Sequence, residues 1–100
     1  IVTAPYHAHT WVSARNKWLN QHFGIERDRI VHTHSKHVVQ GNALIDDSRK
    51  NLAIWSRHYE NSIPILWNRT YNVKEKHDDS ANLVKVDNWQ QVFSILESIK

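Results

Sequence analysis

The chain has no cysteine, and this absence excludes two classes of small protein. Without thiols it is neither a disulfide-stapled scaffold nor a metal site built from thiolates. It also lacks the run of about 20 apolar residues that a membrane-spanning helix needs. Nothing near its start is typical of a secretory signal. We therefore expect a cytoplasmic protein with no membrane partner.

A large excess of one charge is also missing. Thirteen Lys and Arg stand against ten Asp and Glu, which gives a net charge of +3. The basic residues are scattered, whereas a nucleic-acid-binding arm carries them in a block. Single-strand binders also expose aromatic side chains among basic ones, and the tryptophans here have spacings typical of a core. We expect no nucleic-acid partner, although a mild basic balance also suits a phosphorylated small substrate.

The chain instead contains short apolar runs that alternate with helical patterns. Its length predicts a single domain over residues 1–100. The strand-like runs are 1–5, 29–34, 41–47 and 63–67, and the helical patterns are 11–23, 48–59 and 87–99. Such an alternation predicts an α/β fold, a Rossmann-like three-layer parallel sheet with helices on both faces. The polar stretch 68–82 is expected to be irregular, with Asp78 and Asp79 as solvated loop charges.

All three helical patterns have an apolar face, and in the middle one it consists of Leu52, Trp55 and Tyr59. In the first, helical spacing joins Trp11, Trp18, Leu19 and Phe23, and Gly24 is placed to end the helix. Large aromatic side chains dominate buried area, so we expect them in the core. In the last, the apolar stripe consists of Trp89, Val92, Phe93, Leu96 and Ile99. A polar pattern typical of a capping box precedes it.

Two adjacent carboxylates, Asp46 and Asp47, end the apolar run that follows Gly41. In open parallel sheets, ligands bind just beyond the carboxyl ends of the strands. A pair of Asp residues there suits a hard cation such as Mg²⁺. The alternative is a helix N-cap, because Asp and Ser are both good caps. A cap needs only one such residue, whereas Asp46, Asp47 and Ser48 are three consecutive ones. Both the cation site and the N-cap therefore stay open as interpretations.

Three histidines, His32, His34 and His37, raise the alternative of a zinc site. His32 and His34 would share one face of a strand. A zinc site needs further ligands at tight spacing, which this stretch does not supply. We therefore favour hydrogen-bonded polar groups at a strand end.

Several motifs follow one another in the order of a known family. They are Ile1–Pro5, Lys17-Trp18-Leu19 with His22-Phe23-Gly24, Ser35–Val39, Gly41–Asp47, Trp67-Asn68 and Asn88-Trp89. Over nearly its whole length the chain resembles the carboxyl-terminal half of the 5′(3′)-deoxyribonucleotidases, in the haloacid-dehalogenase-like phosphatase superfamily. One departure is Asn42, where relatives often have Asp after the Gly.

The resemblance implies a partial haloacid-dehalogenase-like core and Mg²⁺-dependent hydrolysis of nucleoside monophosphates. Thr3 matches the family's second motif, a hydroxyl that hydrogen-bonds the phosphate. Lys36 matches the third motif, which neutralises phosphate charge, although a solvated Lys is its plainest interpretation. Asp46 and Asp47 match the fourth motif, in which at least one carboxylate holds Mg²⁺.

The family's first motif, Asp-x-Asp, is absent from this sequence. Its first Asp is the nucleophile and its second is the acid/base; the nearest match here is Glu26-Arg27-Asp28. The missing strand would lie between the Thr3 strand and the Asp46 strand, a gap that no backbone hydrogen bond spans. We expect a complementary polypeptide to supply it, with no turnover by the isolated chain. The alternative is a non-catalytic phosphate- or nucleotide-binding or assembly module derived from that fold.

The chain begins at Ile1 rather than at Met, inside a strand-like run. This start fits a processed fragment, a split-gene product or a truncated chain.

Overall fold

The structure, a computed structural model, describes residues 1–7, 9–69, 72 and 83–99. It consists of two compact units, Ile1–Val39 and Gln40–Lys100, and each is described by itself. The expectation of one domain over residues 1–100 stays a prediction. The Asp78–Asp79 pair, predicted to be solvated loop charge, lies outside the described residues. No helix within the described ranges is long and apolar enough to cross a membrane.

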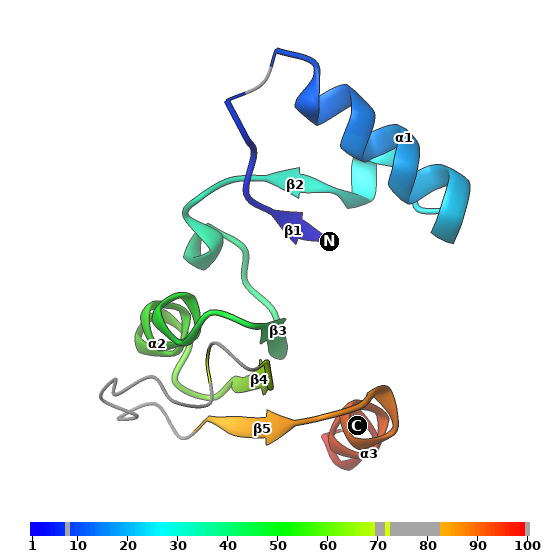
Figure 1. Cartoon of the computed structure of the whole chain (residues 1–100). Helices are drawn as coiled ribbons and strands as arrows, with labels where there is room; N and C mark the ends of the chain where they lie inside the picture. Colours follow the sequence, from blue (N-terminus) through cyan, green and yellow to red (C-terminus); the bar gives the residue numbers. More distant parts are fainter. Residues whose placement is uncertain (8, 70–71, 73–82, 100) are drawn as a thin grey trace. The chain divides into compact units, whose positions relative to one another are not determined.

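The first unit contains a small parallel sheet and one long helix. Its elements are β1 (Val2–Thr3), α1 (Trp11–Phe23), β2 (Val31–His32) and two 3₁₀ turns, η1 (Arg27–Arg29) and η2 (Lys36–Val38) (Figure 1). In the register of the parallel pair β1–β2, Thr3 lies opposite His32. Helix α1 has the predicted bounds. It ends at Gly24, whose φ of 65° is the left-handed conformation that glycine adopts readily.

The prediction that the aromatic side chains of α1 are core residues is wrong for two of them. Leu19 is buried, but Trp18 is 46% exposed and Phe23 is 64% exposed. Trp18 instead packs along the helix, with ring centroids 4.9 Å from His22 and 5.4 Å from Phe23. Helical spacing identifies side chains on one side of a helix, but exposure depends on what covers that side. Because Trp18 is exposed, scattered charge is the stronger of the two observations against a nucleic-acid partner.

The second unit is a three-stranded parallel sheet with two helices. Its elements are β3 (Ala43–Asp46), α2 (Arg49–His58), β4 (Ile63–Trp67), β5 (Val84–Val86) and α3 (Trp89–Ser98). The strand order is β3-β4-β5. Strand β5 was not predicted. It has three residues, Val84-Lys85-Val86, which is too short for alternation to stand out from the polar stretch before it.

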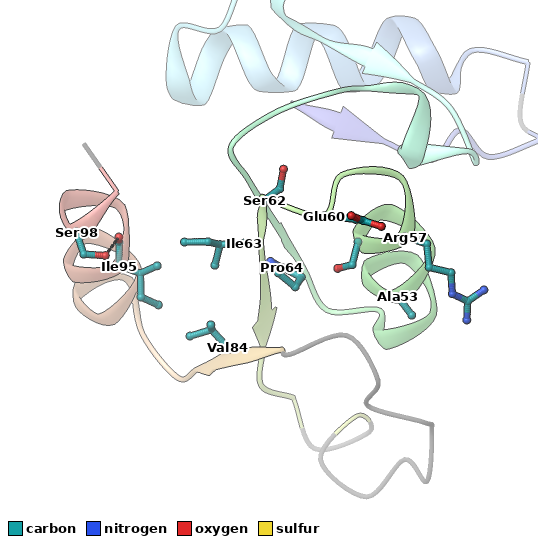
Figure 2. A pocket seen from close by; sticks show the side chains of 10 residues that line it. Ala53, Arg57, Glu60, Ser62, Ile63, Pro64, Val84, Ile95 and Ser98 are labelled. Atoms are coloured by element: carbon teal, nitrogen blue, oxygen red, sulfur yellow. Dashed lines mark hydrogen bonds between the residues drawn. The ribbon is translucent and has the colours of Figure 1, made fainter.

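The helices of this unit cover opposite faces of the sheet (Figures 1 and 2). On one face Ile65 packs with Val86 and with Val92 of α3. Side chains alternate along a strand, so Leu66 points to the other face, where α2 contacts β3 and β4 and buries Leu52 and Trp55. This layering confirms the predicted α/β fold class.

The apolar stripe of α3 is only partly buried. Val92 is fully buried and Leu96 packs against the core, but Trp89 is 57% exposed and Phe93 is 61% exposed. The stripe is wider than the side of the helix that contacts the sheet. The predicted capping pattern is confirmed, since the Asn88 side chain accepts a hydrogen bond of 2.9 Å from the Gln91 backbone N–H.

Candidate active site

The acidic pair lies at the carboxyl edge of the three-stranded sheet. Asp46 is the last residue of β3, and Asp47 and Ser48 form the turn into α2. A cavity of about 330 Å³ opens at this edge. Its lining residues are Ile45, Asp46, Asp47, Trp67, Arg69 and Trp89. The pair therefore stands where ligands bind in open parallel sheets.

The carboxylate of Asp46 is built into the turn. Asp46 is 7% exposed. One of its oxygens accepts a hydrogen bond from the Ser48 backbone N–H at 3.1 Å, and the other accepts one from the Asn51 side-chain amide at 3.3 Å. Ser48 is the N-cap of α2, because its hydroxyl oxygen accepts from the Asn51 backbone N–H at 3.2 Å. The capping interpretation is thus confirmed for Ser48, and both carboxylates remain beside the cavity.

Asp47 is exposed, whereas Asp46 is buried, and both line the same cavity. Carboxylate oxygens are the donors that Mg²⁺ prefers, and each carboxylate oxygen has two acceptor sites. The donor chemistry of the pair fits a hard cation. Within the described residues there is no group of three or more His, Cys, Asp or Glu that could hold a metal ion.

Sequence reasoning missed Asn72, which is fully buried. Its side-chain NH₂ donates to the backbone carbonyls of Asp47 at 2.9 Å and Trp67 at 2.8 Å. Its side-chain oxygen accepts from the Arg69 N–H at 2.8 Å. No sequence signal points to it, because an Asn in a polar stretch is ordinarily exposed.

The two other predicted site residues lie in the first unit. Thr3 ends β1 and is half-buried, and its carbonyl accepts from the Thr33 N–H at 2.9 Å. Lys36 is half-buried and begins η2, just after β2. The structure thus brings Asp46 and Asp47 together in the second unit, with Thr3 and Lys36 in the first. The meeting of all four around one anion stays a prediction.

His32 makes the contacts of a hydrogen-bonded strand residue. Its Nε2 lies 2.7 Å from the Asn16 side-chain oxygen. The Trp11 ring packs edge-on against the imidazole, with ring centroids 5.7 Å apart. Nε2 therefore has a partner on α1, as the favoured interpretation of this histidine requires.

A larger cavity of about 560 Å³ lies near the opposite end of the second unit's strands. Figure 2 shows its walls, with Arg57 in the last turn of α2 and Glu60 just after that helix. Ile63, Pro64 and Val84 lie where β4 and β5 begin. Ligands of open parallel sheets bind at the carboxyl ends of the strands rather than here. We therefore take the smaller cavity beside the acidic pair as the candidate active site.

Comparison with known families matches residues 1–100 to the family described as 5′ nucleotidase, deoxy (pyrimidine), cytosolic type C protein. The match extends over both units and includes all four predicted site residues. A search of curated proteins gives no match.

Proposed function

The chain belongs to this family of 5′-nucleotidases, and from that membership we propose that it forms part of a Mg²⁺-dependent deoxyribonucleotidase. At the level of the family the function is of nucleotidase type, a hydrolase acting on nucleotides. The finer proposal is hydrolysis of the phosphomonoester of nucleoside monophosphates in the cytoplasm. The observation that carries it is the Asp46–Asp47 turn beside a cavity at the carboxyl edge of a parallel sheet.

The acidic pair is proposed to hold the cation. Asp47 offers an exposed carboxylate, and Asp46 offers a carboxylate that hydrogen bonds from Ser48 and Asn51 orient. When bound, Mg²⁺ neutralises phosphate charge and stabilises the charge that develops in the transition state. The protein's part is to keep the two carboxylates in a fixed direction.

Thr3 and Lys36 are proposed to bind the phosphate. The Thr3 hydroxyl donates a hydrogen bond to a phosphate oxygen, and the Lys36 ammonium group offsets its negative charge. Thr3 is the last residue of β1 and Lys36 follows β2, and the carboxyl ends of parallel strands are where side chains reach a ligand.

The nucleophile is proposed to come from a segment outside this sequence, because no Asp-x-Asp occurs in it. A carboxylate oxygen of that segment attacks phosphorus, and the P–O ester bond breaks. The segment's second carboxyl group protonates the leaving oxygen, and water then releases phosphate from the acyl phosphate. Among the described strands, β3 pairs with β4 alone, which leaves its other side for an added strand.

Reconstitution tests this proposal. The amino-terminal segment of a full-length family member, with its apolar strand and Asp-x-Asp, is co-expressed with this chain. We expect Mg²⁺-dependent phosphate release from a deoxypyrimidine monophosphate by the pair and none by the chain alone. The release should disappear with Lys36→Met and with Asp47→Asn, while Lys50→Met, an exposed residue on α2, serves as the control. Release by the isolated chain that is lost with Asp47→Asn contradicts the proposal.

The second candidate is a non-catalytic nucleotide- or phosphate-binding module. It is favoured by a sequence that keeps residues suited to phosphate and cation and has no Asp-x-Asp. Calorimetry with Mg²⁺ and a deoxynucleoside monophosphate separates the two. Binding that persists in the reconstituted pair without phosphate release favours the module.

A further inference from the structure

We propose that Asn72 is a positioning residue that holds the acidic turn, residues 46–48, in the orientation needed to bind a cation. The inference deepens the proposed function and rests on it for the identity of the ligand. It concerns the backbone of the turn, whereas the proposal above concerns the carboxylates themselves.

The side chain of Asn72 joins two segments that are distant in sequence. Its NH₂ group donates to the Asp47 carbonyl, 25 residues away, and to the Trp67 carbonyl at the end of β4. Its oxygen accepts from the Arg69 N–H. All three bonds are 2.8–2.9 Å long, and the residue is 0% exposed. The turn after β3 is thereby tied to the carboxyl end of β4.

A buried arginine holds Asn72 in turn. Arg49, in the first turn of α2, is 4% exposed, and its Nε–H donates to the Asn72 carbonyl at 2.9 Å. The Asp46 carboxylate is bonded to Ser48 and Asn51 of the same helix start. The acidic turn is therefore held by the start of α2 and by Asn72.

This arrangement points to more than stability. Asp47 has an exposed side chain on a backbone whose carbonyl is held by a fully buried amide. Fixing that carbonyl limits the directions in which the Asp47 carboxylate can point into the cavity. Groups that orient metal ligands in this way change metal affinity by about 10–100-fold when they are mutated. A free turn would instead have to be ordered at the moment of binding.

The test compares Asn72→Ala with Asn68→Ala. Asn68 also follows β4, but its side-chain amide donates to Asp87 at 2.8 Å and not to a backbone carbonyl of the acidic turn. Asn72→Ser is the milder variant for use where Asn72→Ala does not fold, because its hydroxyl can still donate one hydrogen bond. Urea unfolding selects conditions under which each variant is folded.

Two readouts are made on the folded proteins by NMR. The first is hydrogen exchange of the Ser48 amide, which donates to the Asp46 carboxylate. The second is affinity for Mg²⁺, titrated through the amide signals of residues 46–48. For the Asn72 variants we expect exchange at Ser48 to be at least about 10-fold faster and Mg²⁺ affinity about 10-fold weaker than in the Asn68 control.

The outcomes separate this inference from the proposed function. Unchanged exchange at Ser48, or lower stability with unchanged Mg²⁺ affinity in the folded variant, overturns the role of Asn72. If exchange is faster in the Asn72 variants but the original chain and the control bind no Mg²⁺, Asn72 stabilises the turn and the proposed Mg²⁺ site is wrong. Faster exchange together with weaker binding supports both.

Discussion

Replacing Asp46 by Asn and by Ala tests how the acidic turn is stabilised. The Asp46 carboxylate accepts one hydrogen bond from the Ser48 N–H and one from the Asn51 amide, and it is 7% exposed. In Asp46→Asn the side-chain oxygen can still accept from Ser48. The new NH₂ group then faces Asn51, whose amide can turn to present its oxygen. Both contacts can therefore be kept in neutral form, whereas Asp46→Ala removes both.

The magnitudes follow from the two hydrogen bonds. A hydrogen bond to a charged group contributes about 1.5–3 kcal/mol and a neutral one about 0.5–1.5 kcal/mol, and an unsatisfied buried donor costs about 1–3 kcal/mol. Water from the adjoining cavity can reach the released donors, which favours the lower figures. We expect the free energy of unfolding to fall by about 1–2 kcal/mol in Asp46→Asn and by about 3–4 kcal/mol in Asp46→Ala. The difference of about 2 kcal/mol corresponds to a Tm about 10 °C lower for Asp46→Ala.

The assay is urea unfolding followed by tryptophan fluorescence, since Trp55 is 1% exposed in the folded chain. Lys50→Ala, an exposed substitution in the first turn of α2, is the control and should change stability by less than about 0.5 kcal/mol. Equal losses in Asp46→Asn and Asp46→Ala would refute the reasoning, because hydrogen-bond acceptance would then not be what Asp46 contributes to the fold.

Three further predictions concern stability and share the same unfolding assay. Val92→Ala should cost about 2–3 kcal/mol because Val92 is fully buried, whereas the neighbouring Phe93→Ala should cost less than about 0.5 kcal/mol because Phe93 is 61% exposed; the reverse order would contradict the observed orientation of α3. Gly24→Ala should cost about 1 kcal/mol, since φ is 65° and no atom lies within 4 Å of the added Cβ; an unchanged midpoint would contradict a left-handed end to α1. Asn88→Ala should cost about 1 kcal/mol through loss of the cap on α3, and Asn88→Ser should recover most of it; failure of that recovery would contradict the capping role.

Much of the fold could be predicted because the signals are local. A short apolar run followed by polar residues predicts a buried strand, and β3 and β4 lie where such runs occur. The bounds of α1 follow from helical spacing that ends at Gly24. Strand β5 could not be predicted, since the alternation Val84-Lys85-Val86 is too short to stand out. Its assignment depends on pairing with β4.

In the candidate site, too, local features could be predicted from the sequence and long-range contacts could not. Asp46 and Asp47 are adjacent in the chain, so their pairing at a strand end could be predicted from the sequence. Asn72 acts on Asp47 across 25 residues, and only a folded chain shows that contact. The exposure of Trp18 and Trp89 also depends on tertiary packing. Helical spacing therefore predicts both in the core, whereas both are exposed in the structure.

The most direct test of the central claim is phosphate release from a deoxypyrimidine monophosphate in Mg²⁺. It is measured for this chain alone and together with a family segment that carries the Asp-x-Asp strand. We predict release by the combination, its loss with Asp47→Asn, and no release by either part alone. A combination that assembles and binds the nucleotide without releasing phosphate would contradict the account, as would turnover by the isolated chain.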